Sequence, residues 1–197
     1  MIPEKIIFVG VLINLITYFL YIKSIFRGGT RPNLISWFIW MLAPFLGFFF
    51  QLKAGAGLSS LSVFMVGFGP LLVITFSLFK KNAFWKIRFF DVVCGIFSLL
   101  ALALYLATKN LVVSIVLVML GDFLAYIPTF VKSWKYPETE SSSIYFGGII
   151  INILSLLIIK NWIFAIYSFP IYLIFGNSIE IFLIYRKKLG FAKGADI

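Results

Sequence analysis

The sequence predicts an all-α integral membrane protein with seven transmembrane helices, arranged as two parallel three-helix bundles joined by a linker helix. Three observations lead to this prediction: the composition, the length of the apolar segments, and the distribution of Lys and Arg. Of the 197 residues, 62% are hydrophobic and only 12% are charged. The apolar runs are too long and too continuous for one face of a soluble helix, so an ordinary soluble domain is excluded.

A transmembrane helix needs about 20 predominantly apolar residues. The chain contains seven such segments, at residues 6–26, 33–52, 58–79, 89–107, 111–131, 143–159 and 162–185. The connections between them are short, which leaves no room for a second, soluble domain.

The first segment has an alternative interpretation as a secretory signal peptide, because Lys5 precedes its apolar run. A signal peptide ends at a small-residue cleavage site, whereas this run ends in Lys-Ser-Ile-Phe-Arg. We therefore interpret the first segment as a span.

The formal net charge of +10 is distributed unevenly along the chain. The N-terminus and the connections after the even-numbered segments contain only Lys5, Lys53, Lys109 and Lys160. The connections after the odd-numbered segments contain all the others: Lys23, Arg27, Arg31, Lys80, Lys81, Lys86, Arg88, Lys132, Lys135, Arg186, Lys187, Lys188 and Lys193. Cytoplasmic loops are enriched in Lys and Arg, so we expect the N-terminus outside and the C-terminus inside. We expect these charges to contact anionic lipid and not nucleic acid.

Two strings of residues are repeated. FGPLLVITFSLFKK, from Phe68 to Lys81, recurs as FGNSIEIFLIYRKK, from Phe175 to Lys188. Upstream of these strings, Lys23, Ser24, Thr30 and Ile35 pair at one constant spacing with Lys132, Ser133, Thr139 and Ile144. Two matches in the same order predict a duplicated unit.

The duplication divides the chain into bundle one at 1–81, a linker helix at 82–108, bundle two at 109–190 and a cytoplasmic tail at 191–197. A unit of three spans begins and ends on opposite sides of the membrane, so two units fused directly would have opposite orientations. One additional linker span makes the two bundles parallel. Parallel bundles of this kind commonly enclose a central solute site.

Cys94 is the only cysteine, and the chain has no histidine. A disulfide within the chain is impossible, and a Cys/His metal site or a histidine-based catalytic triad is not expected. The sequence also has no phosphate-binding loop and no nucleophile–base pair. We expect no cofactor and no enzymatic activity.

Two carboxylates, Asp122 and Glu180, fall within predicted spans. A carboxylate at the centre of a membrane costs about 2.5–3.5 kcal/mol on insertion scales. We therefore expect both side chains to face the protein interior or a water-filled cavity, where they could exchange protons. An alternative for Glu180 is that it extends towards the cytoplasm or pairs with a Lys or Arg.

Other polar and aromatic side chains share helical faces with these carboxylates. Asn177 precedes Glu180 by three residues, and its amide can donate to and accept from a solute. Asn14 with Tyr18, and Asp122 with Tyr126, have i, i+4 spacing. We expect these residues, together with Asn152 and Trp37, to line a solute site. The alternatives are hydrogen bonds between helices for the polar residues and packing for Trp37.

The segment from Tyr126 to Ser143, which begins Tyr-Ile-Pro-Thr-Phe-Val-Lys-Ser, is similar to the Pro-Gln motif of the PQ-loop superfamily. That superfamily includes SWEET sugar transporters, cystinosin-type amino-acid exporters and KDEL receptors, and its 3 + 1 + 3 layout resembles the one predicted here. Pro128 matches the proline of the motif, whereas Thr129 replaces the usual glutamine and Phe19 stands opposite Pro128 in the first copy.

The resemblance implies a transporter that moves a small polar, sugar- or amino-acid-like solute by alternating access. It implies hinges at Pro128 and Pro44, solute contact at Asn177, and proton coupling through an acid in the last helix, where Glu180 lies. Pro70 occupies the position that matches Asn177 in the first copy. The alternative function is a non-transporting receptor of the KDEL-receptor type. Short loops favour a bacterial inner membrane, and homo-oligomerisation is left open.

Overall fold

The computed structural model describes residues 3–80, 84–108, 110–187 and 189. Lys81, Lys109, Lys188, Lys193 and the predicted tail at 191–197 lie outside them. Within the described residues the chain forms helices and no strand. The α-helices are α1 (Ile7–Arg27), α2 (Leu34–Lys53), α3 (Leu61–Leu78), α4 (Phe89–Ala107), α5 (Leu111–Lys135), α6 (Ser143–Leu157) and α7 (Phe164–Tyr185).

Each predicted apolar segment coincides with one of these helices to within a few residues at each end. The largest difference is at the end of α5, which continues past residue 131 to Lys135. The continuation contains the polar residues Lys132 and Ser133, which are buried. Their partners lie on other segments of the chain, so a hydropathy pattern ends this helix too early.

Five of the described helical segments are long and apolar enough to cross a membrane, and two shorter apolar stretches accompany them. The shorter stretches are Phe89–Leu104 and Ser143–Leu157. α6 has 15 residues and is therefore about 22 Å long, less than the hydrocarbon core of about 30 Å. The helices indicate an all-α membrane protein.

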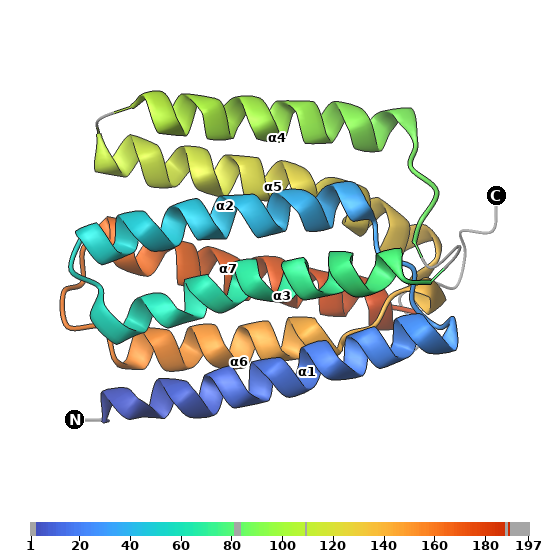
Figure 1. Cartoon of the computed structure of the whole chain (residues 1–197), viewed down its shortest axis with the longest axis horizontal. Helices are drawn as coiled ribbons and strands as arrows, with labels where there is room; N and C mark the ends of the chain where they lie inside the picture. The colour runs from blue at the N-terminus through green and yellow to red at the C-terminus, as the bar shows by residue number, and fades with distance from the viewer. Residues whose placement is uncertain (1–2, 81–83, 109, 188, 190–197) are drawn as a thin grey trace.

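The helices lie side by side and alternate in direction (Figure 1). The connections that follow α1, α3 and α5 therefore lie at the same end as the end of α7. We call this the basic end, because it includes Arg27, Arg31, Lys86, Arg88 and Lys135. The other end, where α1 begins, is called the opposite end.

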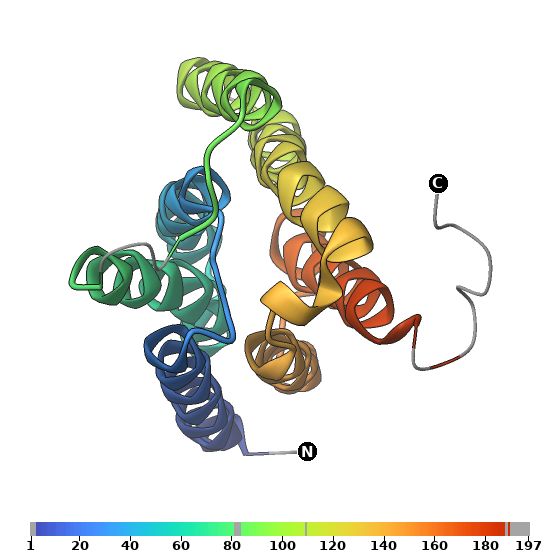
Figure 2. The same cartoon turned by 90° about the vertical axis from the view of Figure 1, so that its right-hand side faces the viewer.

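The first three and last three helices pack in the same order. α3 contacts both α1 and α2, and α7 contacts both α5 and α6. We call α1, α2 and α3 the first bundle and α5, α6 and α7 the second bundle. The bundles meet where α1 packs on α6 and where α2 packs on α5 (Figure 2). α4 lies outside this assembly against α5 and α2. A duplicated three-helix unit predicts this pattern of contacts.

Local sequence determines several helix ends. The Asn33 carboxamide oxygen accepts from the Ile35 amide at 3.2 Å, and that of Asn110 accepts from the amides of Val112 and Val113. These side chains satisfy amides that have no partner within the first turn of a helix. α1 ends at Gly28, whose φ of 83° lies in the left-handed region.

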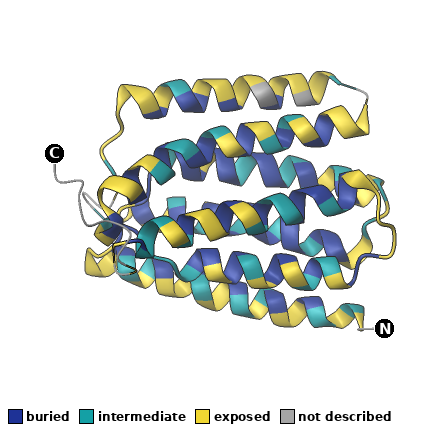
Figure 3. Cartoon of the chain, turned by 180° about the vertical axis from the view of Figure 1, so that it is seen from behind, coloured by how far each residue is buried: buried dark blue, intermediate teal, exposed yellow. Residues whose placement is uncertain are grey.

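The burial pattern is that of a protein in lipid. Large apolar side chains such as Phe8, Phe19 and Phe97 are exposed on the outer faces (Figure 3). Polar side chains, among them Asn14, Asp122 and Glu180, are buried between the helices. An exposed apolar surface of this extent is unfavourable in water and favourable in a bilayer.

Two glycines bring tyrosine rings against a neighbouring helix. A Cβ atom on Gly69 would lie 1.7 Å from Cζ of Tyr18, and a Cβ on Gly176 would lie 3.1 Å from Cζ of Tyr126. Tyr18 and Tyr126 therefore occupy equivalent places in the two bundles. This equivalence shifts the repeat by one residue within α1, so Leu20, and not the expected Phe19, stands opposite Pro128.

We predict that Gly69→Ala destabilises the protein by about 1–3 kcal/mol, because the new methyl group overlaps the Tyr18 ring. Thermal unfolding in detergent measures the effect. Gly47→Ala is the matched control, since a Cβ there meets only ordinary contacts at 3.7 and 3.9 Å. Equal melting temperatures for the two variants would contradict the close approach of Tyr18 to α3.

Candidate functional site

A small cavity lies between the two bundles. Its volume is about 40 Å³. Every α-helix except α4 contributes described residues to its wall: Asn14, Tyr18, Trp37, Trp40, Val66, Pro70, Asp122, Tyr126, Ile144, Tyr145, Gly148, Leu173 and Asn177. A cavity of this size has room for about three water molecules.

Asp122 is the charged residue of the cavity wall. Its side chain is fully buried, and its Oδ2 accepts a hydrogen bond of 2.9 Å from the Tyr172 hydroxyl. Its Oδ1 has no hydrogen-bond partner among the described residues. The indole Nε1 of Trp40 donates to the Asp122 backbone carbonyl at 3.4 Å, which connects α2 of the first bundle to α5 of the second.

Asn177 and Tyr126 form a second polar pair in the wall. The Tyr126 hydroxyl donates to Oδ1 of Asn177 at 3.0 Å. Gly148 leaves space for this amide, because a Cβ there would lie 2.6 Å from Nδ2 of Asn177. The pair therefore depends on a small residue in α6.

Other residues of the cavity wall have polar atoms that lack partners. The Asn14 Oδ1, the Trp37 Nε1 and the Tyr145 hydroxyl are buried with no hydrogen-bond partner among the described residues. An unpaired buried polar atom costs about 1–3 kcal/mol. Four such atoms, counting Oδ1 of Asp122, belong to residues of this one wall, and those that face the cavity suit water molecules or a polar solute.

Aromatic rings occupy much of the remaining wall. Trp37 lies 5.5 Å from Trp40, and Trp40 lies 4.6 Å from Tyr126, between ring centroids. These contacts run from α2 to α5. The predicted positions of Trp37, Tyr18 and Tyr126 at a common site agree with this arrangement.

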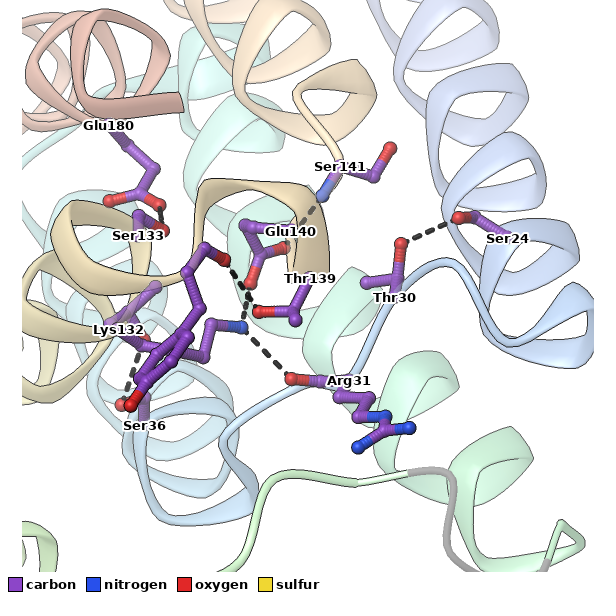
Figure 4. A network of polar contacts seen from close by, with 12 residues as sticks. Ser24, Thr30, Arg31, Ser36, Lys132, Ser133, Thr139, Glu140, Ser141 and Glu180 are labelled. Atoms are coloured by element: carbon purple, nitrogen blue, oxygen red, sulfur yellow. Dashed lines mark hydrogen bonds and ion pairs between the residues drawn. The ribbon is translucent and has the colours of Figure 1, made fainter. Parts of the chain in front are cut away.

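Glu180 lies in a separate buried cluster nearer the basic end (Figure 4). The Ser133 hydroxyl donates to its Oε1, and its Oε2 has no hydrogen-bond partner among the described residues. The carboxyl is fully buried, so the alternative of extension to the cytoplasmic surface is wrong for this structure. Glu180 also does not belong to the cavity wall.

Lys132 and Glu140 form an ion pair beside Glu180. Both side chains are buried. The Lys132 ammonium also donates to the Arg31 carbonyl at 2.9 Å, and the Arg31 amide donates to the Thr139 carbonyl at 3.0 Å. Because Arg31 follows α1 and the other residues belong to the second bundle, these contacts close the basic end (Figure 4).

A hydroxyl pair supports the same closure. Thr129 donates to Ser36 at 3.1 Å, between α5 and α2.

At the opposite end, the Gln51 side-chain amide donates to the Ile166 carbonyl at 3.2 Å, and the Ser155 hydroxyl donates to the Ser59 carbonyl at 2.9 Å. The cavity is thus bounded at both ends by hydrogen bonds between the bundles.

The structure brings together most of the predicted site residues: Asn14, Tyr18, Trp37, Asp122, Tyr126 and Asn177. Asn152 is not among them, which corrects that prediction. Its Nδ2 donates to the Gly148 carbonyl of its own helix at 2.8 Å, because the spacing of four residues puts that carbonyl within reach.

Pro44 and Pro128 lie inside the continuous helices α2 and α5. Pro44 is buried, and Pro128 borders a separate groove of about 170 Å³ with Trp85, Arg88 and Asp91. Neither proline lines the cavity.

Sequence reasoning missed Tyr145 and Tyr172. Tyr145 shares a face of α6 with Gly148, three residues later, and that spacing could have been noticed. Nothing local to Tyr172 indicates that its hydroxyl reaches Asp122 on another helix. The burial of Lys132 was also missed, because a lysine at the end of an apolar segment is ordinarily exposed.

We predict that Lys132→Met destabilises the protein by about 3–5 kcal/mol, because the Glu140 carboxylate would remain buried without its partner. Replacing both residues, as Lys132→Met with Glu140→Gln, should recover much of this loss. Thermal unfolding of the two single variants and the double variant completes the cycle. Strictly additive effects would contradict the pairing.

No protein-family model, curated protein or solved structure matches the chain. The functional assignment therefore depends on the geometry of the cavity and on the arrangement of the helices around it.

Proposed function

We propose that the protein is a membrane transporter that moves a small polar solute by alternating access. The observation that carries the proposal is the cavity between two similarly packed bundles, whose wall contains the buried, partly unpartnered side chains of Asn14 and Asp122. Hydrogen bonds connect the two bundles on either side of it, towards each end of the helices. A solute site that opens to one side at a time requires two such closures.

We infer that all seven helices span the membrane, with the N-terminus outside and the basic end in the cytoplasm. The shorter stretches in α4 and α6 run beside the five long helices (Figure 1). The concentration of Lys and Arg at the basic end supports the orientation. We place the protein in a bacterial inner membrane as part of the same proposal.

In the proposed cycle the bundles rock against each other around the cavity. The contacts that would change are those between α1 and α6 and between α2 and α5. Pro44 lies in α2 and Pro128 lies in α5, so both proposed hinges belong to helices of one of these interfaces. A proline removes one helical hydrogen bond and permits bending there.

The two buried carboxyls are candidates for proton coupling. Asp122 lies in the cavity wall, and Glu180 lies beside the contacts that close the basic end. A proton gained or lost at either position changes the charge of a buried group. Such a change alters the stability of the closed arrangement around it.

We predict that a disulfide between the bundles stops transport. In a Cys94→Ala background, Ser36→Cys with Thr129→Cys places two thiols where the hydroxyls are 3.1 Å apart across the interface. Oxidation should abolish solute exchange in proteoliposomes, and a reductant should restore it.

The matched control is Ser24→Cys with Thr30→Cys, whose hydroxyls are 2.6 Å apart within the first bundle. Its oxidation should leave exchange unchanged. Full exchange in the oxidised Ser36→Cys, Thr129→Cys variant would contradict alternating access. Solute binding without exchange in the unmodified protein would replace the transporter with a receptor.

A further inference from the structure

The residues of the cavity wall also indicate the charge of the solute. We infer that the transported solute is a small organic cation, and that it binds Asp122 in exchange for a proton. This inference rests on the proposed function, because it specifies the solute class of the same site.

The first observation is the charge of the cavity wall. The carboxyl group of Asp122 can carry a negative charge, and no Lys or Arg is among the described residues that line the cavity. Lys132, the buried lysine that follows Asp122 in α5, is paired with Glu140 and lies outside the wall. The ion pairs of the described residues are Lys132 with Glu140 and Lys160 with Glu4, so Asp122 has no protein counter-ion.

A buried carboxylate without a counter-ion is unfavourable by several kcal/mol. It must therefore be neutralised by a proton or by a bound positive charge. Since the protein supplies no positive charge here, both the proton and the cation come from outside. They compete for the same carboxylate.

The second observation is the chemistry of the unpartnered atoms. Oδ1 of Asp122 and Oδ1 of Asn14, the unpartnered atoms that α5 and α1 contribute through residues of the wall, are both hydrogen-bond acceptors. A protonated amine carries donors and no acceptor, so it satisfies these atoms without leaving groups of its own unpaired. A carboxylate or phosphate would meet Asp122 and find no basic residue.

The third observation is the aromatic wall. Trp37, Trp40 and Tyr126 form a series of ring contacts along the cavity. Aromatic rings attract cations through the negative charge of their faces, by about 0.5–2 kcal/mol for each contact. A neutral sugar would use the hydrogen-bonding groups but would leave the carboxylate charge uncompensated.

The volume of about 40 Å³ is small for an organic cation. In the proposed cycle, a proton therefore neutralises Asp122 in this arrangement. When the bundles separate at one end, the cation binds and the proton passes from the carboxyl to water. One positive charge enters and one leaves, so the charge of the site is unchanged.

Lower pH should weaken cation binding, because the proton and the cation compete. The other titratable groups facing Asp122 are tyrosines: Tyr172, which donates to Oδ2, and the cavity residues Tyr126, Tyr18 and Tyr145. α2 faces the site with Trp37 and Trp40. α4 packs on α5, where the Ser98 carbonyl lies near Gly121, and contributes no described residue to the wall.

The test uses matched charged and uncharged probes on the purified full chain. Choline is compared with 3,3-dimethylbutan-1-ol, and phenethylammonium with 2-phenylethanol, by isothermal titration calorimetry. We expect each cation to bind about tenfold or more tightly than its neutral partner. Its affinity should fall as the pH is lowered, while that of the neutral compound should not.

Substitutions test the role of the carboxylate. Asp122→Asn keeps the size and removes the charge, so cation binding should weaken by about tenfold or more. Glu138→Gln removes an exposed carboxylate outside the cavity and should bind as the unmodified protein does. Asn14 occupies the position in α1 equivalent to Asp122. Combining Asp122→Asn with Asn14→Asp should therefore restore cation binding.

The outcomes separate this inference from the proposed function. Equal or tighter binding of the neutral compounds, or full cation binding by the Asp122→Asn variant, would overturn the cation assignment. Transport of uncharged solutes would then still support a transporter. Failure to bind any probe would also overturn the cation assignment, and the disulfide experiment would decide independently whether the bundles alternate.

Discussion

Lipid acyl chains offer no hydrogen-bond partners, and this constraint determines which side chains lie inside the protein and which face the membrane. Every polar side chain within an apolar helix must find its partner in the interior or in a cavity. Phe8, Phe19 and Phe97 therefore lie outside, while Asp122 and Glu180 lie inside. The interior contacts that satisfy polar groups include Tyr172 with Asp122 and Ser133 with Glu180. Some atoms stay unsatisfied among the described residues: Oδ1 of Asn14 and Oδ1 of Asp122 belong to residues of the cavity wall, whereas Oε2 of Glu180 lies outside it.

The two bundles are alike in packing and different in chemistry. Tyr18 lies on Gly69 as Tyr126 lies on Gly176, so each bundle packs a tyrosine ring of its first helix on a glycine of its third. Asn14, in contrast, is the counterpart of Asp122, and Pro70 is the counterpart of Asn177. The second bundle thus supplies the carboxylate of the cavity and the first supplies its two tryptophan rings, Trp37 and Trp40. Each bundle also contributes an amide, Asn14 from the first and Asn177 from the second.

The sequence alone predicted where the helices lie, but it did not predict all the contacts that their side chains make between helices. Long apolar runs locate each helix, because a helix in lipid must be apolar over most of its length. The i, i+4 spacing of Asn14 with Tyr18 and of Asp122 with Tyr126 predicted that each pair shares a helical face, and all four residues line the cavity. Asn152 does not line the cavity: its Nδ2 donates to a carbonyl of its own helix, and its Oδ1 has no partner among the described residues. The burial of Lys132 depends on Glu140 and the Arg31 carbonyl, which only the folded chain brings together.

The central claim is that two bundles move against each other around a polar cavity. The most direct measurement is the distance between spin labels across each end, in a Cys94→Ala background. Labels at Leu58→Cys with Trp162→Cys report on the opposite end, and labels at Arg27→Cys with Tyr136→Cys report on the basic end. The account predicts two distance populations at each end, with the long population at one end accompanying the short population at the other. A single unchanged distance at both ends, with and without solute, would contradict it.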